Sequence, residues 1–324
     1  MTTLREWPIT RAAGNIARLA NTPRGAAVLF AWFLMWDLVV IVPAIGGAYP
    51  AGGDAVIYAR GAAAYLQGGS PWDAYLQFGS SVAHFAGLPP TVIAFIPFAL
   101  LPDVLVAGLW VVGSLVAAVV ALRALRLPLW WLTFPPLVDG IWSGNPQVAV
   151  LALLVAGTRV EWVAVLLKVY AIVPLLGERR WRAVFVAGLA FVVTAVLAWP
   201  AWIDYLSNLS TITTRLMAES GGGFSAYRDP LELGITVAAV LLLATVDLRA
   251  AGWLAVPAVW PATQLHYSIL AMPVIDWPLG FAFAFPDWST VPLIVLAYAG
   301  YRLLRDGRGW PSHLWRWRAA ARSG

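Results

Sequence analysis

The sequence contains no cysteine, only three histidines and few charged residues. Without cysteine the chain can form neither a disulfide nor a thiolate metal site, and its redox compartment cannot be inferred. Charged residues make up 11% of the 324 residues, against roughly 25% in a soluble domain, while 61% are hydrophobic. This composition excludes an ordinary soluble protein and predicts a chain that resides in lipid.

The motifs of several soluble enzyme classes are also missing. The sequence has no HExxH and no nucleophile elbow. It also has no glycine-rich phosphate loop, which argues against a domain that binds and hydrolyses ATP. The net charge of +5 comes from arginines clustered at the termini and between apolar segments. In a membrane protein such clusters are better explained by membrane orientation and by binding of anionic lipid head groups than by binding of nucleic acid. We therefore expect membrane lipids, and no nucleic acid, among the partners.

Long apolar stretches are what the sequence has in abundance. A helix that crosses the hydrocarbon core needs about 20 apolar residues, and shorter or proline-broken helices occur where they are buried in protein or line a cavity. The sequence predicts an all-α polytopic membrane protein with about ten transmembrane helices, some of them short and broken. A re-entrant pair around Gly144–Gln147 would lower that number by two. The predicted spans are 26–46, 89–101, 103–122, 127–141, 146–158, 161–177, 182–200, 230–246, 251–275 and 288–304.

Arginine-rich loops set the expected orientation. Residues 1–25 are predicted to form a cytoplasmic amphipathic arm, 26–304 the transmembrane bundle, and 305–324 a basic, tryptophan-rich cytoplasmic tail. The loops 47–88 and 201–229 then face outward across the cytoplasmic (plasma) membrane. In this count Arg123 and Arg126 fall outside, against the rule. Either the count is wrong there, or both are held outside for a reason, which makes them candidates for substrate binding.

Both outer loops carry a predicted interfacial helix. The first loop contains a short amphipathic helix with Tyr58 and Arg60, preceded by Asp54. In the second loop, apolar residues recur at helical spacing between Trp202 and Leu216, and a run of three glycines follows. This second segment is either a lid over a site or a simple connector.

Three ionisable residues are the candidates for chemistry. Asp54 is expected to be ionised at neutral pH and could accept a proton from a hydroxyl group, although a solvated loop acid is the plainer interpretation. Lys168 lies in the middle of a predicted span, so either an anion or a buried acid accounts for it. His266, flanked by Gln264 and Tyr267, is expected near the outer boundary, at the depth of Asp54, or is a packing residue.

Several short motifs, taken in order, resemble glycosyltransferase family 87, the polyprenyl-phosphate-mannose-dependent mannosyltransferases of the C-type superfamily. None of these motifs is specific alone, but their order and topological spacing are similar to the family pattern. The sequence departs from that pattern in having Leu88 before the proline pair, Val169 after Lys168, and a shorter chain. The matching motifs are Gly53-Asp54 with Tyr58, Gly68-Gly69, Pro89-Pro90 with Pro97 and Leu101-Pro102, Gly144-Asn145-Pro146-Gln147, Lys168 with Pro174, Glu178–Arg182, and His266-Tyr267.

The resemblance implies an inverting transfer of a sugar, commonly mannose, from a polyprenyl-phosphate donor to a lipid or glycan acceptor at the outer face. It implies that Asp54 is the base and that His266 positions or polarises substrate groups. Lys168, or an arginine such as Arg60, would neutralise the donor phosphate. Because a lipid phosphate is the leaving group, the resemblance implies neither a cofactor nor a bound metal.

Two other function classes remain open on the sequence. A lipid or solute transporter or flippase also uses broken helices and buried charges, but such proteins usually show two similar halves, and the Asp54 loop has no repeat in the second half. A non-catalytic envelope scaffold is the third possibility, with the basic tail as a docking or head-group-binding element.

Overall fold

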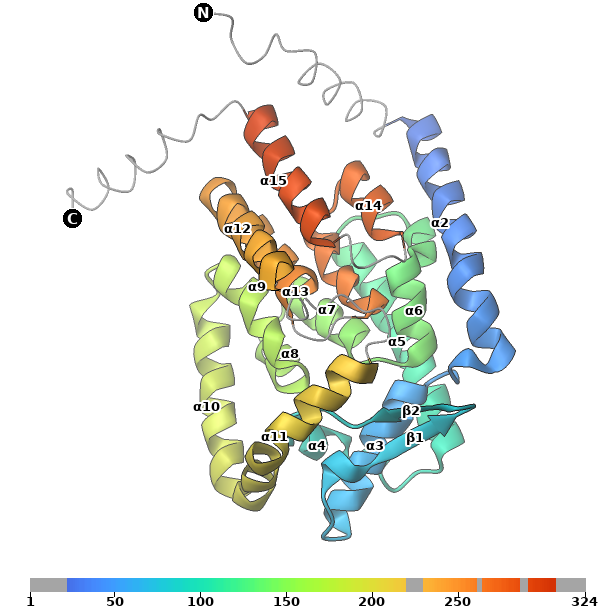
Figure 1. The fold of residues 1–324 in the computed structure, drawn as a ribbon, viewed down its shortest axis with the longest axis vertical. Helices are drawn as coiled ribbons and strands as arrows, with labels where there is room; N and C mark the ends of the chain where they lie inside the picture. Colours follow the sequence, from blue (N-terminus) through green and yellow to red (C-terminus); the bar gives the residue numbers. More distant parts are fainter. Residues whose placement is uncertain (1–21, 220–229, 261–263, 286–290, 307–324) are drawn as a thin grey trace, which may run out of the picture.

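The computed structural model describes residues 22–219, 230–260, 264–285 and 291–306, which are almost wholly helical. Helices pack side by side in an elongated bundle, and a small two-stranded sheet lies at its lower end (Figure 1). This architecture is compatible with the predicted all-α membrane protein. The predicted arm 1–25, the tail 305–324 and the three glycines 221–223 lie mostly or wholly outside the described residues.

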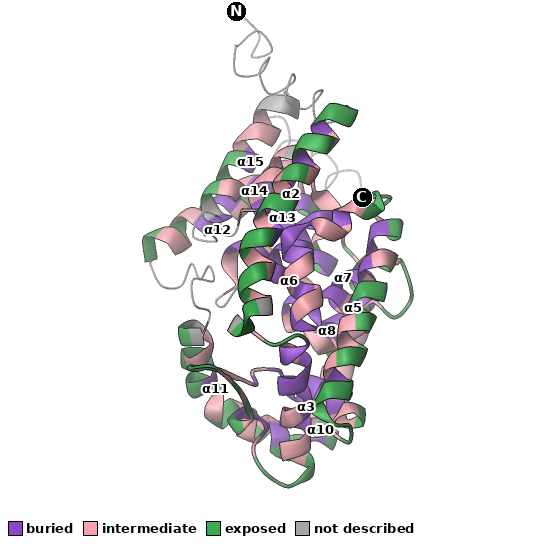
Figure 2. Cartoon of the chain, turned by 90° about the vertical axis from the view of Figure 1, so that its right-hand side faces the viewer, coloured by how far each residue is buried: buried purple, intermediate pink, exposed green. Residues whose placement is uncertain are grey.

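Two helices in the described part of the chain are each long and apolar enough to cross a membrane: α2 (Pro23–Pro43) and α5 (Asp103–Ala124). α2 begins where the Thr22 hydroxyl accepts a hydrogen bond from the Gly25 N–H at 3.1 Å and Pro23 occupies the first turn. Each turn of α2 has a buried and an exposed face, and the buried face lies against the bundle (Figure 2). The exposed side carries large apolar residues such as Leu38, as expected for a lipid-facing surface.

Two bent pairs of helices are each either a broken span or a re-entrant loop. α6 (Pro135–Ser143) and α7 (Gln147–Val155) meet at 118° around Gly144, and α10 (Trp181–Leu197) meets residues 199–216 of α11 (Trp199–Glu219) at 100°. The first bend falls where the sequence allowed a re-entrant pair. In the described residues this gives two spans, or four if each bent pair counts as one, so the expected ten are not confirmed.

Several predicted spans are broken in the structure, among them 127–141, which divides at the extended Phe134. Segment 89–101 contains only α4 (Pro89–Phe95) and the 3-10 turn η4 (Ile96–Phe98), because its prolines interrupt the helical hydrogen bonds. Segment 161–177 divides at Lys168, whose backbone is extended, and segment 251–275 divides after Val259. The resulting pieces are α8 (Trp162–Leu167), η6 (Val169–Ala171), α9 (Ile172–Gly177), α13 (Leu248–Val259) and the 3-10 helix η8 (Leu265–Val274).

Other elements complete the bundle and its lower end. The predicted amphipathic helix of the first outer loop is α3 (Gly53–Leu66), and that of the second is α11. The hairpin of β1 (Tyr75–Phe78) and β2 (Ser81–His84), antiparallel with Tyr75 opposite His84, was not predicted. The remaining elements are η2 (Ala44–Ala48), η3 (Pro71–Asp73), η5 (Leu129–Thr133), α12 (Pro230–Val246), α14 (Trp277–Phe283) and α15 (Val291–Asp306).

Arg123 and Arg126 do not lie at the end of the bundle opposite the start of α2, where the span count placed them. Both end α5, and η5, which follows them, packs on the N-terminal half of α2: the rings of Phe30 and Trp130 lie 5.9 Å apart. Because segment 89–101 does not form a full span, α5 is the crossing that returns the chain to the end where α2 begins. Arg123 and Arg126 therefore lie at the same end of the bundle as the start of α2.

Apolar packing divides into two main clusters that lie at different ends. The larger cluster fills the bundle between α2, α5, α6, α7, α13 and η8, and includes Phe33, Leu122 and Trp253. The smaller cluster joins α3, α4, the hairpin and α11 through Trp72 and Phe85. The polar residues described next lie where the two clusters meet.

Candidate active site

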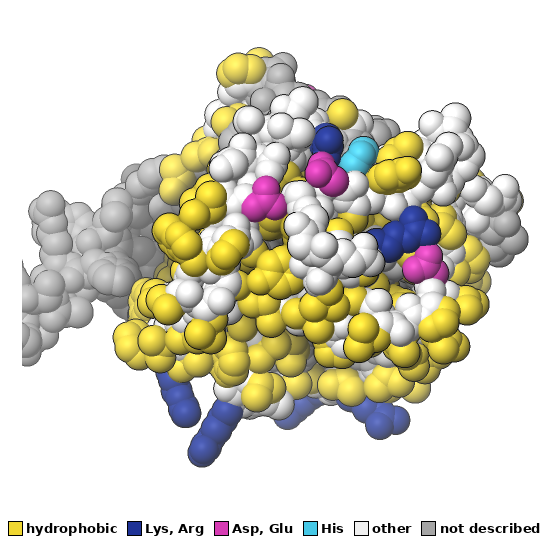
Figure 3. All heavy atoms as spheres, turned by 90° about the horizontal axis from the view of Figure 1, so that it is seen from below, with side chains coloured by type: hydrophobic (Ala, Val, Ile, Leu, Met, Phe, Trp, Pro, Cys, Tyr) yellow, Lys and Arg dark blue, Asp and Glu magenta, His cyan; other side chains and the backbone are white. Residues whose placement is uncertain are grey.

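A cavity of about 760 Å³ lies between α3, β2, α11 and the broken segment around Lys168. Its walls combine apolar side chains such as Ile57 and Ile212 with polar groups from Asp54 and Lys168. Seen from below, this end of the molecule exposes mainly hydrophobic side chains with only scattered charges (Figure 3). The cavity therefore suits an amphiphilic ligand that approaches along a largely apolar surface.

Backbone geometry fixes Asp54 in the first turn of α3. Gly52 has a left-handed conformation (φ 70°), and its N–H donates to the Trp142 carbonyl at 2.7 Å. The Trp142 indole in turn donates to the Tyr49 carbonyl at 3.0 Å. A side chain at position 52 would begin 2.5 Å from the Cα of Ala107, so only glycine fits there. The negative carboxylate at the helix N-terminus is also favoured by the helix dipole.

Two side chains hold the Asp54 carboxylate. The Tyr49 hydroxyl donates to one oxygen at 2.5 Å, and the Asn145 amide donates to the other at 2.6 Å. Burial, and then the neighbouring Asp54, raise the pKa of the Tyr49 phenol, which therefore remains protonated as a donor. The Asn145 amide is oriented by the Gln147 N–H, which donates to its oxygen at 2.9 Å. The half-buried Asp54 thus has one defined orientation toward the cavity.

Lys168 also lines this cavity and places a positive charge at its wall. Its ammonium donates to the Tyr58 hydroxyl at 2.6 Å and lies 5.1 Å from the Tyr58 ring centre and 5.8 Å from that of Tyr267. Among the described residues, no carboxylate lies within 4.0 Å of it, so the buried-acid alternative is not supported. Asp54 and Tyr58 are one turn apart on α3, which brings the carboxylate and the cation to neighbouring parts of one wall.

His266 lies behind the wall and does not line the cavity. Its side chain is only 3% exposed, and Nδ1 is 2.9 Å from an oxygen of Asp139 that also accepts the His266 backbone N–H at 3.2 Å. The prediction that Asp54 and His266 project into one cavity is therefore wrong for His266. Its neighbours Gln264 and Tyr267 do line the cavity. Asp139 was not singled out from the sequence, although an acid inside a predicted span was the available signal.

The structure does not bring the three candidate arginines to the cavity. Arg60 donates to Asp103 at 2.7 Å and to the Tyr75 carbonyl at 2.9 Å, on the exposed side of α3. Arg123 and Arg126 lie at the far end of α5, some 20 residues from the end that contacts Gly52, or about 30 Å along the helix. The described candidates that share the cavity are Asp54, Tyr58, Lys168, Gln264 and Tyr267.

An apolar groove of about 470 Å³ adjoins this cavity. It runs between α9, α12 and α13, with Val173, Val240 and Val256 among its lining residues. Trp260 lines both the groove and the cavity, and its ring packs against that of Tyr170 with centres 4.9 Å apart. A ligand with a polar head at Lys168 and a hydrocarbon chain could occupy both spaces.

A model of glycosyltransferase family 87 matches residues 85–275 of the chain. The matched stretch contains Asn145, Lys168 and His266, whereas Asp54 precedes it. No curated protein and no solved structure matches the chain.

Proposed function

We propose that this chain, which belongs to glycosyltransferase family 87 and is therefore a membrane glycosyltransferase, transfers a sugar from a polyprenyl-phosphate donor to a hydroxyl group of a lipid or glycan acceptor. Mannose is the sugar we propose, and the outer face of the cytoplasmic membrane is the proposed place of transfer. The observation that carries the proposal is that a carboxylate and a cation, Asp54 and Lys168, line one cavity, and that an apolar groove adjoins it at Trp260.

In the proposed reaction the acceptor hydroxyl oxygen attacks the anomeric carbon of the donor sugar. Asp54 takes the hydroxyl proton as the new bond forms. The bond between the anomeric carbon and the phosphate oxygen breaks, and the electron pair leaves with the polyprenyl phosphate. A single displacement of this kind inverts the anomeric configuration.

Lys168 acts on the leaving group. Negative charge grows on the phosphate oxygen as the glycosidic bond breaks, so a fixed ammonium stabilises the transition state more than the bound donor. The hydrogen bond to Tyr58 holds that ammonium against the cavity wall. Tyr49 and Asn145 have the corresponding task for Asp54, because their hydrogen bonds fix the position of its carboxylate.

The apolar groove supports a lipid-linked donor. Its lining contains no charged residue, and α12, which contributes Val237, Val240 and Leu241, is among the apolar helices of the bundle. A polyprenyl chain in this groove would lie beside the lipid while its phosphate reached Lys168. Burial of hydrocarbon contributes about 0.8 kcal/mol per CH₂ group, so even a short buried portion would add substantially to donor affinity.

The proposal is tested with the full-length protein reconstituted in lipid nanodiscs. Radiolabelled polyprenyl-phosphate mannose and a membrane lipid extract are added, and labelled products are separated. We expect a labelled product, release of polyprenyl phosphate in equal amount, and an anomeric configuration opposite to that of the donor. Retention of configuration would contradict the single displacement, and a preference for a nucleotide-sugar donor would contradict the lipid-linked one.

A further inference from the structure

Residues 161–180 form a helical hairpin with Lys168 near its turn. α8 forms one arm and α9 the other, and the two ends of the segment meet because Glu161 and Glu178 both contact Arg180. Lys168 at the turn lines the cavity. The position of the ammonium in the cavity therefore depends on how this 161–180 hairpin is held.

The two arms pack in different parts of the bundle. α8 packs against α7 and α10, whereas α9 packs mainly against α13 and less extensively against α10. The backbones of α9 and α13 are in direct contact: a Cβ on Gly177 would lie 2.8 Å from the Cα of Gly252. Relative movement of the two groups of helices would thus pull the hairpin arms apart and displace its turn.

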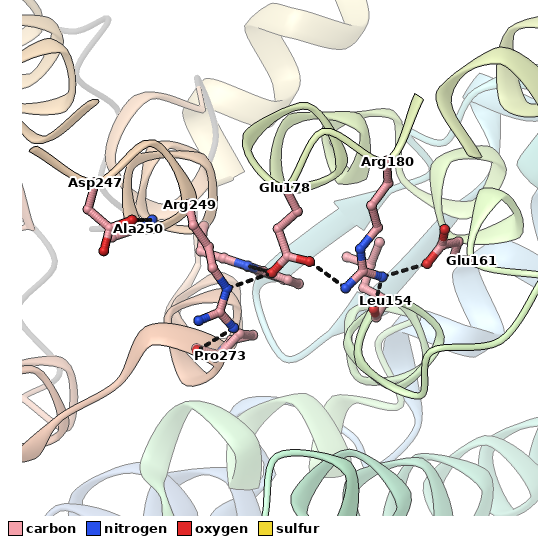
Figure 4. A network of polar contacts seen from close by, with 9 residues as sticks. Leu154, Glu161, Glu178, Arg180, Asp247, Arg249, Ala250 and Pro273 are labelled. Atoms are coloured by element: carbon pink, nitrogen blue, oxygen red, sulfur yellow. Dashed lines mark hydrogen bonds and ion pairs between the residues drawn. The ribbon is translucent and has the colours of Figure 1, made fainter. Parts of the chain in front are cut away.

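Arg180 ties both arms and a third helix together (Figure 4). Its guanidinium donates to Glu161 at 2.5 Å and to the Leu154 carbonyl, at the end of α7, at 2.7 Å, and it also forms an ion pair with Glu178. These groups are mostly buried, with side-chain exposures of 28% for Arg180 and 17% and 12% for the two glutamates. A planar guanidinium presents its donors in a rigid fork that suits two carboxylates and a carbonyl, whereas an ammonium is a point charge on a flexible stem.

The two glutamates depend on Arg180 to different degrees. Glu178 also accepts hydrogen bonds from Arg249 at 2.9 Å and from the Trp253 indole at 2.8 Å. For Glu161, the described part of the chain contains no second ion pair. Loss of Arg180 would thus leave the α9 end anchored and free the α8 end.

The turn of the hairpin has its own anchor. The Thr91 hydroxyl on α4 lies 3.0 and 3.1 Å from the carbonyl oxygens of Leu166 and Leu167, the two residues before Lys168. The turn is also held by the hydrogen bond from Lys168 to Tyr58 and by the Tyr170 hydroxyl, which donates to Gln147. The ion pairs of Arg180 hold the two ends of the hairpin.

We propose that Arg180 is a positioning residue for the donor: by closing the ends of the 161–180 hairpin it fixes the Lys168 ammonium where a lipid phosphate binds. This inference rests on the proposed donor site at Lys168. Arg180 itself touches neither substrate nor cavity. Its effect is expected on donor affinity and not on the acceptor, because Asp54 is held by α3 and the α6–α7 turn.

The test measures the dissociation constant of polyprenyl phosphate for the protein in nanodiscs, together with donor KM, acceptor KM and kcat. Arg180→Met is expected to weaken polyprenyl phosphate binding and raise donor KM about tenfold, as displacements remote from a site do, with acceptor KM within twofold. Arg180→Lys should recover part of the affinity. Arg182→Met, an exposed arginine two residues along, is the matched control and should bind as wild type.

A second variant keeps the test informative if Arg180→Met does not fold. Glu161→Gln removes only the α8 contact and is expected to weaken binding severalfold without loss of folded protein. If Lys168→Met weakens polyprenyl phosphate binding but the Arg180 and Glu161 variants do not, the positioning role is overturned alone. If Lys168→Met binds as tightly as wild type, the donor site itself is wrong, and the positioning role with it. Equal changes in donor KM, acceptor KM and kcat would show general destabilisation and also overturn it.

Discussion

Replacing Lys168 with methionine should separate donor binding from every other property of the site. Methionine keeps the length and apolar contacts of the lysine stem against the rings of Tyr58 and Tyr267, and removes only the charge and its hydrogen bond. A charge-assisted hydrogen bond contributes about 1.5–3 kcal/mol. Because Lys168 is partly exposed, we take a value near the middle, about 2 kcal/mol, which corresponds to a roughly 30-fold loss of donor affinity.

The loss in kcat/KM should exceed the loss in affinity, since the phosphate carries more charge in the transition state than in the bound donor. Binding is measured by titration of polyprenyl phosphate into nanodiscs, and transfer with labelled donor. Lys168 is the only lysine in the sequence, so selective labelling of lysine amines reports on it directly, and donor should protect it. Arg60→Met, a cation on α3 outside the cavity, is the control and should bind normally. Unchanged donor affinity in Lys168→Met would refute the reasoning.

Three further predictions concern the groove, the turn before Asp54 and the buried ion pairs. Ala255→Phe should fill the apolar groove and raise KM for a long-chain polyprenyl donor about tenfold, but leave KM for a two-isoprene donor unchanged. Gly52→Ala should destabilise the protein by about 1–3 kcal/mol and lower kcat, because it strains a left-handed position and displaces Asp54. Lowering the pH below about 4.3 should destabilise wild type more than Glu178→Gln, as judged by thermal unfolding.

The sign of the pH effect follows from the balance at Glu178. Burial opposes its ionisation, but hydrogen bonds from Trp253 and Arg249 and the charge of Arg180 lower its pKa below the ordinary value. Ionised Glu178 thus contributes its full stabilisation at a pH above the pKa of an ordinary glutamate. That contribution is lost as the pH falls through the lowered pKa that Glu178 has in the folded protein. An equal decline in Glu178→Gln would contradict this.

Matched controls exist for the other two variants. Leu189→Phe, on the lipid-exposed side of α10, should leave donor KM unchanged, and a rise equal to that of Ala255→Phe would rule out a chain-specific groove. Gly113→Ala, on α5 with open space around it, should be tolerated. If Gly52→Ala were tolerated equally well, the backbone account of Asp54 placement would be wrong.

Much of the helical architecture could be predicted because apolar length and periodicity are local properties. The sequence placed α12 at its observed bounds and the amphipathic helices α3 and α11 in the right loops. It failed where tertiary contacts break a continuous apolar run. The sequence of residues 161–177 does not predict the extended backbone at Lys168. The Lys168 side chain there contacts Tyr58 of α3 and Tyr267 of η8, which are far away in the sequence.

The candidate site was predicted only in part, because local sequence features reveal single charged residues but not the tertiary contacts between them. Lys168 was found because a charge inside an apolar span needs an explanation, and Asp54 because it is an acid at the start of the helix in the first outer loop. His266 was misplaced because its depth was counted along a continuous helix, whereas the chain leaves α13 at Val259 and re-enters as η8 behind the wall. Asn145 was seen only as part of a motif, and Tyr49 not at all, because their roles arise from distances between residues far apart in sequence.

The most direct test of sugar transfer by this cavity is the activity of Asp54→Asn in the nanodisc assay. Asparagine keeps the size of the side chain and can still accept from Tyr49, but its amide nitrogen cannot accept from Asn145 and it cannot take the acceptor proton. Loss of general base catalysis should lower kcat about 10²- to 10⁴-fold, with polyprenyl phosphate affinity and thermal stability close to wild type. Asp73→Asn, an exposed acid at the same end of the molecule, should retain full activity. An Asp54→Asn variant with kcat within a few-fold of wild type would contradict the account.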